Sequence, residues 1–398
     1  MAVQSSLFIS FLYSVAHSSH YTWHSLPTRR DCQHMMRLVE TVKHKLYPFV
    51  ARYICNSTLV EGSLSEAGET VRCMFIDNSN YAAYMIARMF ASPPRVVKKG
   101  KVLIQDLRRT LQRNADAADL YIAVLPDNCD NPLASMADFK GHPYIDQIID
   151  TSKSWESIAQ KFHDSKRKFS NRLERKSGMK CRISHDKEDF ALFYRRMFLP
   201  LIEVQYAGQA DIDLFEEMYE YFVKGFLLFV ESGGDATAGA LCVAENDTLI
   251  FRRSGVLDGR EDLRKQGMQS ALYYFIIRYA LEHGIKRVDT MKSRPLLNDG
   301  VFVTKRRWGA GVLKDVEADT EVYYFIPQYS SKIAAFFAQN PMIVNKNGGL
   351  SALVGLGASQ EPSGQLMREL TRSYYSSGLD KLLLLKPDSP DPIEYSFS

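Results

Sequence analysis

The stretch RKQGMQSA, residues 264–271, stands between a predicted strand at Thr248–Val256 and a long predicted helix at 267–283. The strand closes a three-stranded antiparallel meander over residues 226–256, in which apolar residues alternate with a period of two between short turns. The helix shows apolar residues at helical spacing. A further strand is expected at 287–291, so this part of the chain is predicted to be mixed α/β.

The junction at 264–271 has the chemistry of a phosphate site. The first N–H groups of a helix have no partner within it, and the helix dipole is positive at that end. A glycine lets a phosphate approach the backbone closely, and polar side chains add donors. The candidate cofactor-binding residues are Arg264, Lys265, Gln266, Gly267, Gln269 and Ser270. A glycine that simply begins a helix explains the same pattern equally well.

A second informative stretch, residues 293–310, follows the strand at 287–291. It contains Ser293-Arg294-Pro295, Asp299-Gly300 and Lys305-Arg306-Arg307-Trp308-Gly309. Polar loops at the carboxyl ends of strands are where α/β sheets usually bind ligands. We expect Arg294 and Lys305 to fix anionic groups of a substrate and Trp308 to pack against it. For Trp308, a place in the apolar core is the stronger expectation.

The ordered series of these motifs resembles the GNAT acyltransferases, in the branch related to polysaccharide-associated acetyltransferases and Fem-type peptidoglycan aminoacyltransferases. It begins with the Ser154-Trp155 helix and its basic continuation, and runs on through the meander and the 264–271 junction. It ends on the Ser-Arg-Pro and Lys-x-x-Trp-Gly loop. The resemblance covers roughly residues 148–312.

The resemblance implies two tandem GNAT-like domains, each with a mixed, mainly antiparallel central sheet flanked by helices. We expect a degenerate GNAT-like domain at 29–147 and an acyltransferase domain at 148–345. We expect residues 1–28 to be a loose leader, residues 30–47 to be a helix, and residues 346–398 to be a C-terminal extension that is partly disordered.

The resemblance also bears on the acyl donor. The superfamily motif for the acyl-CoA pyrophosphate is Arg/Gln-x-x-Gly-x-Gly/Ala, which Arg264 and Gly267 match and Gln269 does not. Acyl-CoA, most simply acetyl-CoA, is the expected co-substrate. Aminoacyl-tRNA, the donor that a resemblance to Fem-type enzymes implies, is the alternative. The basic run at 161–182, with nine Lys and Arg against two acids, suits a polyanion or a solvated helix face.

Acyl transfer to an amine or hydroxyl needs a base for the acceptor's proton and a backbone N–H to polarise the donor's carbonyl. The strand Thr248–Val256 is the expected source of that N–H. Glu203 and Asp289 are the candidate bases and Tyr206 a candidate acid. Glu203 and Tyr206 lie in a helix-breaking connection that is expected at 200–210, after Pro200. For each carboxylate, a structural ion pair with one of the many basic residues is the more frequent role.

The composition of the chain bears on other classes of protein, such as membrane proteins and proteins held together by zinc or disulfides. The chain has 398 residues with 50 Lys and Arg against 46 Asp and Glu, a formal charge of +4. No run of about 20 apolar residues is present, which predicts no membrane-spanning helix. The six cysteines are scattered singly, which predicts neither zinc nor a disulfide framework and favours a cytoplasmic location. No metal site is expected.

The sequence therefore predicts an N- or O-acyltransferase of the GNAT type. Its acceptor would be a small molecule or a glycan or peptide precursor, and both the acceptor and the oligomeric state stay open. A Fem-type aminoacyltransferase, with tRNA as partner, is the first alternative. A non-catalytic GNAT-like binding module is the second, because no residue stands out as an unambiguous base.

Overall fold

The computed structural model describes residues 54–65, 68–113, 115–126, 134–176, 178–206, 213–357, 360–387 and 389–397. The chain divides into two units, Met1–Tyr53 and Ile54–Ser398, and everything below concerns the second. The predicted leader and the predicted helix at 30–47 lie outside the described residues.

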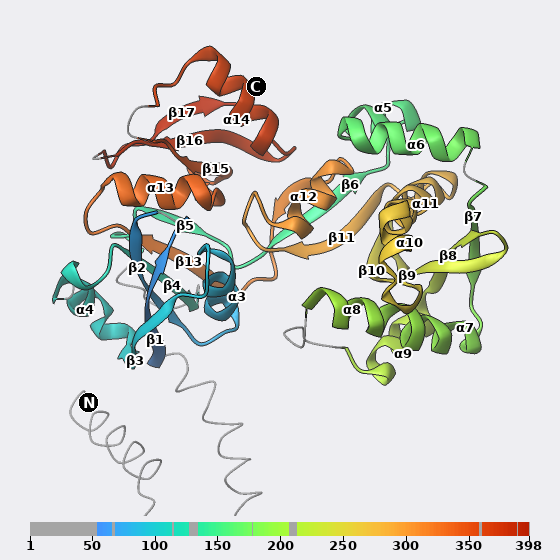
Figure 1. The fold of residues 1–398 in the computed structure, drawn as a ribbon, viewed down its shortest axis with the longest axis horizontal. Coiled ribbons are helices and arrows are strands. Elements are labelled where there is room, and N and C mark those ends of the chain that lie inside the picture. The colour runs from blue at the N-terminus through green and yellow to red at the C-terminus, as the bar shows by residue number, and fades with distance from the viewer. Residues whose placement is uncertain are drawn as a thin grey trace, which may run out of the picture. The chain divides into compact units, whose positions relative to one another are not determined.

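The described strands form two mixed, mainly antiparallel sheets (Figure 1). The ten-stranded sheet has the order β17-β16-β15-β14-β5-β13-β4-β2-β1-β3, with parallel pairs only at β2/β4 and β15/β16. Its strands are β1 (Ile54–Ser63), β2 (Thr70–Asp77), β3 (Arg95–Leu103), β4 (Leu120–Pro126), β5 (Phe139–Gly141), β13 (Thr320–Phe325), β14 (Met342–Lys346), β15 (Gly349–Gly355), β16 (Leu379–Leu385) and β17 (Ile393–Ser396).

The seven-stranded sheet comes from one continuous segment between the two parts of the ten-stranded sheet. Its order is β12-β6-β11-β10-β9-β8-β7. The strands are β6 (Ile145–Asp150), β7 (Lys180–Ser184), β8 (Phe226–Ser232), β9 (Asp235–Glu245), β10 (Thr248–Val256), β11 (Arg287–Ser293) and β12 (Gly311–Lys314). The meander β8-β9-β10 is antiparallel, as the period-two pattern predicts.

Helices cover both faces of the seven-stranded sheet. One face shares a core with α5 (Trp155–Gln160), α6 (Asp164–Lys176), α10 (Glu261–Gln266) and α11 (Met268–Glu282). The other face shares a core with α7 (Lys187–Leu192), a π-helical segment (Phe193–Phe198) and α9 (Phe215–Lys224). The helices α8 (Leu199–Tyr206) and α12 (Gly300–Arg307) complete this part of the chain.

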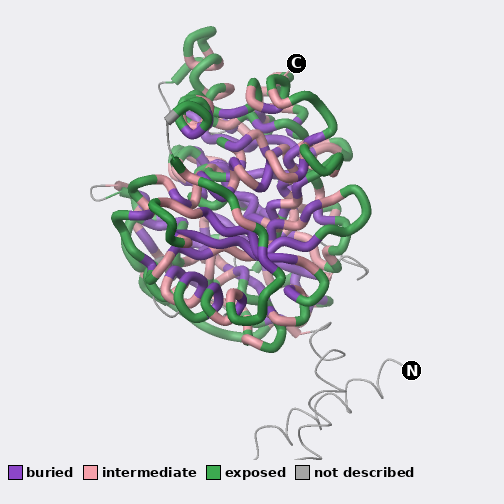
Figure 2. Tube along the Cα trace, turned by 90° about the vertical axis from the view of Figure 1, so that its right-hand side faces the viewer, coloured by how far each residue is buried: buried purple, intermediate pink, exposed green. Residues whose placement is uncertain are grey.

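Helices also cover the ten-stranded sheet. Helices α3 (Tyr81–Arg88) and α13 (Ser331–Gln339) share one core with it, and α4 (Leu107–Arg113) belongs to a second. Helix α14 (Gly364–Tyr374) packs in a cluster that joins residues of β6, α12 and β12 to β14, β15 and β16. Figure 2 shows the buried positions concentrated in the interior and the exposed ones in the outer turns and helices.

The fold class is therefore as predicted, but two local expectations differ from the structure. Residues 346–398 pair into the ten-stranded sheet through β15, β16 and β17, because apolar runs such as that of β16 are buried between neighbouring strands. Residues 200–206, expected as a helix-breaking connection, form α8. The π-helical segment carries the chain into it, with the Leu199 N–H bonded to the Tyr194 carbonyl five residues back. The domain limits given above stay a prediction.

Among the described residues, no helix is both long and apolar enough to cross a membrane.

Candidate active site

The site is organised by the way β10 and β11 separate. These two strands are parallel and pair only over three residues each, from Thr248 opposite Arg287 to Ile250 opposite Asp289. Beyond this point β10 continues beside β9, with a bulge between Phe251 and Arg253, and has no register pair with β11 (Figure 1). We call the opening between residues 251–256 of β10 and the end of β11 the strand fork.

The N-terminus of α11 lies at the open end of the strand fork, because α11 leads from the end of β10 back to the start of β11. Gly267 joins α10 to α11 with a φ of +91°, a left-handed conformation that favours glycine. The Ala271 N–H is bonded to the Gly267 carbonyl at 2.9 Å. The N–H groups of residues 268–270 precede this first bond of the helix and form its positive end.

Helix α6 packs over this junction. A Cβ on Gly267 would lie 2.7 Å from the Phe169 ring, so the glycine is required by packing as well as by its backbone conformation. The Lys166 Nζ donates to the Ser270 Oγ at 2.6 Å and lies 5.5 Å from the centroid of the Trp308 ring. Burial and the nearby Arg307 lower the pKa of Lys166. A cation at the positive end of a helix is unfavourable by itself and suits an anion bound between them.

The other predicted cofactor-binding residues differ in their exposure. Arg264 and Gln269 are half-buried, and Gln266 is exposed. Lys265 is exposed and forms an ion pair with Glu261 across one turn of α10, at 2.9 Å. The structure therefore places Gly267, Gln269 and Ser270 at the start of α11, whereas Lys265 is engaged in an ion pair with Glu261.

Of the predicted catalytic residues, Asp289 lies at the strand fork. It belongs to the last register pair of β10 with β11, and its Oδ1 accepts the N–H of Met291 at 2.7 Å. Glu203 is an exposed residue of α8, and no hydrogen bond or ion pair joins it to Asp289 among the described residues. Tyr206 is the last residue of α8, and its side chain lies outside what the structure describes.

A bulge in β11 follows directly. The register against β6 shifts between Asp289 and Lys292, and Met291 has a φ of +67°. Lys305 of α12 holds the bulge: its Nζ donates to the Met291 carbonyl at 2.8 Å, the Lys292 carbonyl at 3.1 Å and the Ser293 Oγ at 2.9 Å. Burial lowers the pKa of Lys305 to about 7, against the opposing charges of nearby aspartates. These three hydrogen bonds are all to the chain itself, and the predicted contact of Lys305 with substrate stays a prediction.

Asp146 of β6 is a candidate that sequence reasoning missed. It is the register partner of Lys292, and Ile148, two residues on, is the partner of Asp289, so these side chains share one face of the sheet. Burial raises the pKa of Asp146 to about 6, with Asp315 adding to the rise and Lys292 opposing it. The only sequence signal is a carboxylate in an otherwise apolar strand, and its neighbours are fixed by pairing between strands distant in sequence.

Asp315 explains why Asp146 has no cation of its own. Lys292 donates to the Asp315 Oδ1 at 2.8 Å, and the Asp315 side chain is almost fully buried. The ion pair leaves Asp146 beside a carboxylate that is already paired. A carboxyl group in such surroundings takes up a proton near neutral pH, as a general base must.

The remaining predicted substrate residues, Arg294 and Trp308, are both buried. Arg294 is 9% exposed and directly follows β11. Trp308 is fully buried in a ring cluster, with the centroids of Phe162 at 5.0 Å and Tyr273 at 5.8 Å, and its Nε1 has no hydrogen-bond partner. The core position considered for Trp308 is therefore the one observed.

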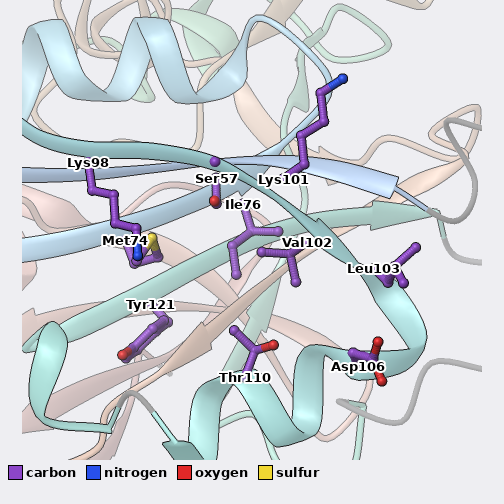
Figure 3. A pocket seen from close by; sticks show the side chains of 11 residues that line it. Ser57, Met74, Ile76, Lys98, Lys101, Val102, Leu103, Asp106, Thr110 and Tyr121 are labelled. Carbon is purple, nitrogen blue, oxygen red and sulfur yellow. The ribbon is translucent and has the colours of Figure 1, made fainter. Parts of the chain in front are cut away.

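A pocket of about 380 Å³ lies elsewhere, in the ten-stranded sheet (Figure 3). Apolar side chains such as Ile76 and Val102 line it together with Lys98 and Lys101 of β3 and with Thr110 of α4. In Figure 3 the Lys98 side chain extends toward Met74, whereas that of Lys101 points away from the other labelled side chains. None of its lining residues is a predicted site residue. In the part of the chain that the structure describes, no group of three or more His, Cys, Asp or Glu side chains is placed to hold a metal ion.

Comparison with known proteins agrees with the fold of the seven-stranded sheet. Residues 160–295 match the model of the acetyltransferase (GNAT) domain, a span that includes β10, α10, α11 and β11. No curated protein matches the chain.

Similar solved structures cover about two thirds of this chain at low identity. FemX is 13% identical, with a TM-score of 0.36, over 67% of this chain and 83% of its own. L-PGS from Bacillus licheniformis is 10% identical, with a TM-score of 0.32, over 66% and 82%. A GCN5-related N-acetyltransferase from Sphaerobacter thermophilus is 12% identical, with a TM-score of 0.31, over 66% and 78%. The family match confirms the predicted resemblance for this part of the chain: residues 160–295 are similar to the acetyltransferase (GNAT) domain.

Proposed function

We propose that this protein transfers an acyl group from acyl-CoA, most simply acetyl-CoA, to an amine or hydroxyl of an acceptor. The observation that carries the proposal is the strand fork, an opening between parallel strands with the N-terminus of α11 at its mouth. A thioester laid along residues 251–256 of β10 would find, on the edge that faces away from β9, backbone N–H groups that have no register partner in β11. Such preorganised donors stabilise charge that develops on the carbonyl oxygen.

The carboxylates of the shared face supply the base. We assign Asp146 the removal of the acceptor's proton, directly or through a water, because its pKa of about 6 leaves it ionised yet basic at neutral pH. As the acceptor's nitrogen or oxygen bonds to the acyl carbon, the carbon–sulfur bond breaks and the thiolate leaves. Asp289, already bonded to the Met291 N–H, positions the end of β11.

The end of α11 would hold the donor's phosphates. The N–H groups of residues 268–270 form the positive end of α11, and the Lys166 ammonium is bonded to the hydroxyl of Ser270 at this same end. An anion bound there would gain from both. Replacing Gly267 by a bulky residue is no clean test of this site, because the change would also displace Phe169.

A sharper test uses two lysines of the same helix. Lys166→Met should weaken acetyl-CoA binding about tenfold or more, since a charged hydrogen bond to phosphate contributes roughly 1.5–3 kcal/mol. Lys168→Met should leave it unchanged, because Lys168 is exposed on α6 and has no contact with the α11 end among the described interactions. Calorimetric titration with acetyl-CoA measures both. Equal affinities in the two variants would contradict the assignment.

Aminoacyl-tRNA is the second candidate donor, and α6 is the observation that favours it. This basic helix lies over the end of α11 with Lys168, Arg172 and Arg175 exposed. Nucleic-acid binding would weaken steeply as salt is raised, because it releases counterions from the phosphates. An absence of tRNA binding at low salt removes this candidate. A non-catalytic binding module is excluded as soon as any acceptor yields an acylated product.

A further inference from the structure

Arg294 is a buried cation whose partners are nearly all aromatic. Its guanidinium carbon lies 4.0 Å from the ring centroid of Tyr144, 4.9 Å from that of Tyr84 and 5.3 Å from that of Tyr81. Tyr81 and Tyr84 belong to α3, so residues from the ten-stranded sheet's own helix surround an arginine that follows β11. The side chain is 9% exposed.

The hydrogen bonds of Arg294 leave most of its donors unused. A guanidinium has five N–H donors, and among the described residues Arg294 forms one hydrogen bond, from Nη1 to the Pro143 carbonyl at 3.3 Å. None of the ion pairs among the described residues involves Arg294. Aromatic faces offset part of the cost of burying a charge, by about 0.5–2 kcal/mol each, but they accept no further N–H bonds in the guanidinium plane.

The carboxylate that is bonded to Tyr84, that of Asp299, has partners other than Arg294. Asp299 caps the N-terminus of α12, with its Oδ1 accepting the N–H groups of Val301 and Phe302, and its Oδ2 accepts the Tyr84 hydroxyl at 2.6 Å. The hydroxyl of Tyr81 is paired with that of Tyr324 at 3.1 Å. The rings of Tyr81 and Tyr84 are thus held beside Arg294 by hydrogen bonds that do not involve the arginine.

The unused donors are within reach of solvent. Among the described residues, no nitrogen of Arg294 is a fully enclosed side-chain atom without a hydrogen-bond partner. Tyr144, the closest ring, is 37% exposed and marks the open side. A ligand can therefore approach a preorganised, partly desolvated guanidinium.

We propose that Arg294, framed by Tyr81, Tyr84 and Tyr144, binds an oxyanion, a carboxylate or a phosphate group carried by the acceptor. A guanidinium fork matches such groups through two parallel N–H···O bonds, and arginine is the residue best suited to this. The site directly follows Ser293, whose Oγ accepts from Lys305 at 2.9 Å, so it stands one residue beyond the bulge of the candidate active site. Because Tyr81 and Tyr84 belong to α3, this helix would help to select an anionic acceptor. Only the identification of the carrier as the acceptor rests on the proposed function.

The test is an anion titration followed by the melting temperature of the full chain. Because the α11 end is itself proposed to bind phosphate, all proteins carry Lys166→Met. Inorganic phosphate and acetate are compared with chloride at equal ionic strength. We expect a saturable rise of the melting temperature with one of the two oxyanions, as binding to the native state requires. A response to phosphate alone identifies a phosphate, and one to acetate identifies a carboxylate.

Two variants locate the effect. Arg294→Lys keeps the positive charge but removes the guanidinium and its paired N–H donors. Tyr144→Leu removes the nearest ring. Because Tyr144 is exposed, this second variant can be tested even if the first does not fold. Each should weaken the anion's apparent affinity about threefold or more, an effect of roughly 0.6 kcal/mol. Arg182→Lys is the matched control: Arg182 lies 4.7 Å from the Phe229 ring but is paired with Asp189 and Glu231. No saturable rise in the parent, or affinities in the Arg294 and Tyr144 variants that match the control, would overturn the proposal.

Discussion

Two lysines, the half-buried Lys166 and the buried Lys305, lie at different places in the candidate site and have opposite surroundings. Lys305 donates all its hydrogen bonds to the chain, to two carbonyls and a hydroxyl, and has aspartates nearby. Lys166 has one hydroxyl partner, a tryptophan face, and further positive charge from Arg307 and the α11 end. Lys305, whose N–H donors all have acceptors within the chain, stabilises the fold. Lys166, which has one acceptor and lies among other positive charges, is suited to bind an anionic ligand.

The largest effect that follows from this comparison is on stability. Lys305→Met should lower the free energy of unfolding by about 3 kcal/mol, because it leaves the Met291 and Lys292 carbonyls without their donor, at roughly 1–3 kcal/mol each. Denaturant unfolding measures the change. Lys381→Met, at an exposed ion pair with Glu394, should cost less than about 1 kcal/mol. Equal losses in the two variants would show that Lys305 does not hold the bulge.

Substitution of Gly267 should lower the stability less than Lys305→Met does, and a second glycine separates the two causes of the loss. Gly267→Ala should cost about 2 kcal/mol, since it adds a Cβ in a left-handed conformation and 2.7 Å from the Phe169 ring. Gly284→Ala isolates the conformational part, about 1 kcal/mol, because its φ is +68° and nothing lies within 4 Å of the new Cβ. If the two variants lose the same stability, Phe169 does not press on the junction.

Asp146 predicts a pH dependence of defined sign. Its pKa in the folded chain, about 6, is above its ordinary value of 3.8, so the folded state favours the protonated form. Its contribution to stability is therefore full below pH 3.8 and is lost as the pH rises through 6. Asp146→Asn should flatten the pH dependence of unfolding in this range and be at least as stable as the parent at pH 8.

The same variant should lose acyl transfer. The rate of the parent should rise with pH through about 6 as the base ionises, and the variant should lack this limb. Loss of activity without loss of stability would separate a base from a structural carboxylate. A variant with the parent's rate and pH profile would exclude Asp146 as the base.

The structural features that the sequence predicts are those that depend on local residue patterns. The meander, the long helix and the junction at Gly267 follow from apolar periodicity and from a glycine at a helix start. Asp146 and the tail of the chain were beyond such patterns, because the neighbours of Asp146 and the pairing of β16 depend on strands far away in sequence. Lys305 and Trp308 have the residue types of a binding site, and only packing shows that their contacts are internal.

The central claim is that the donor lies in the strand fork, and amide hydrogen exchange with and without acetyl-CoA tests it most directly. We predict slower exchange at residues 268–270 of α11 and at residues 251–256 of β10, where unpaired N–H groups would gain partners. Exchange in β7 and β8 should not change. Unchanged exchange at both predicted segments under saturating acetyl-CoA, or protection confined to other elements, would contradict the account.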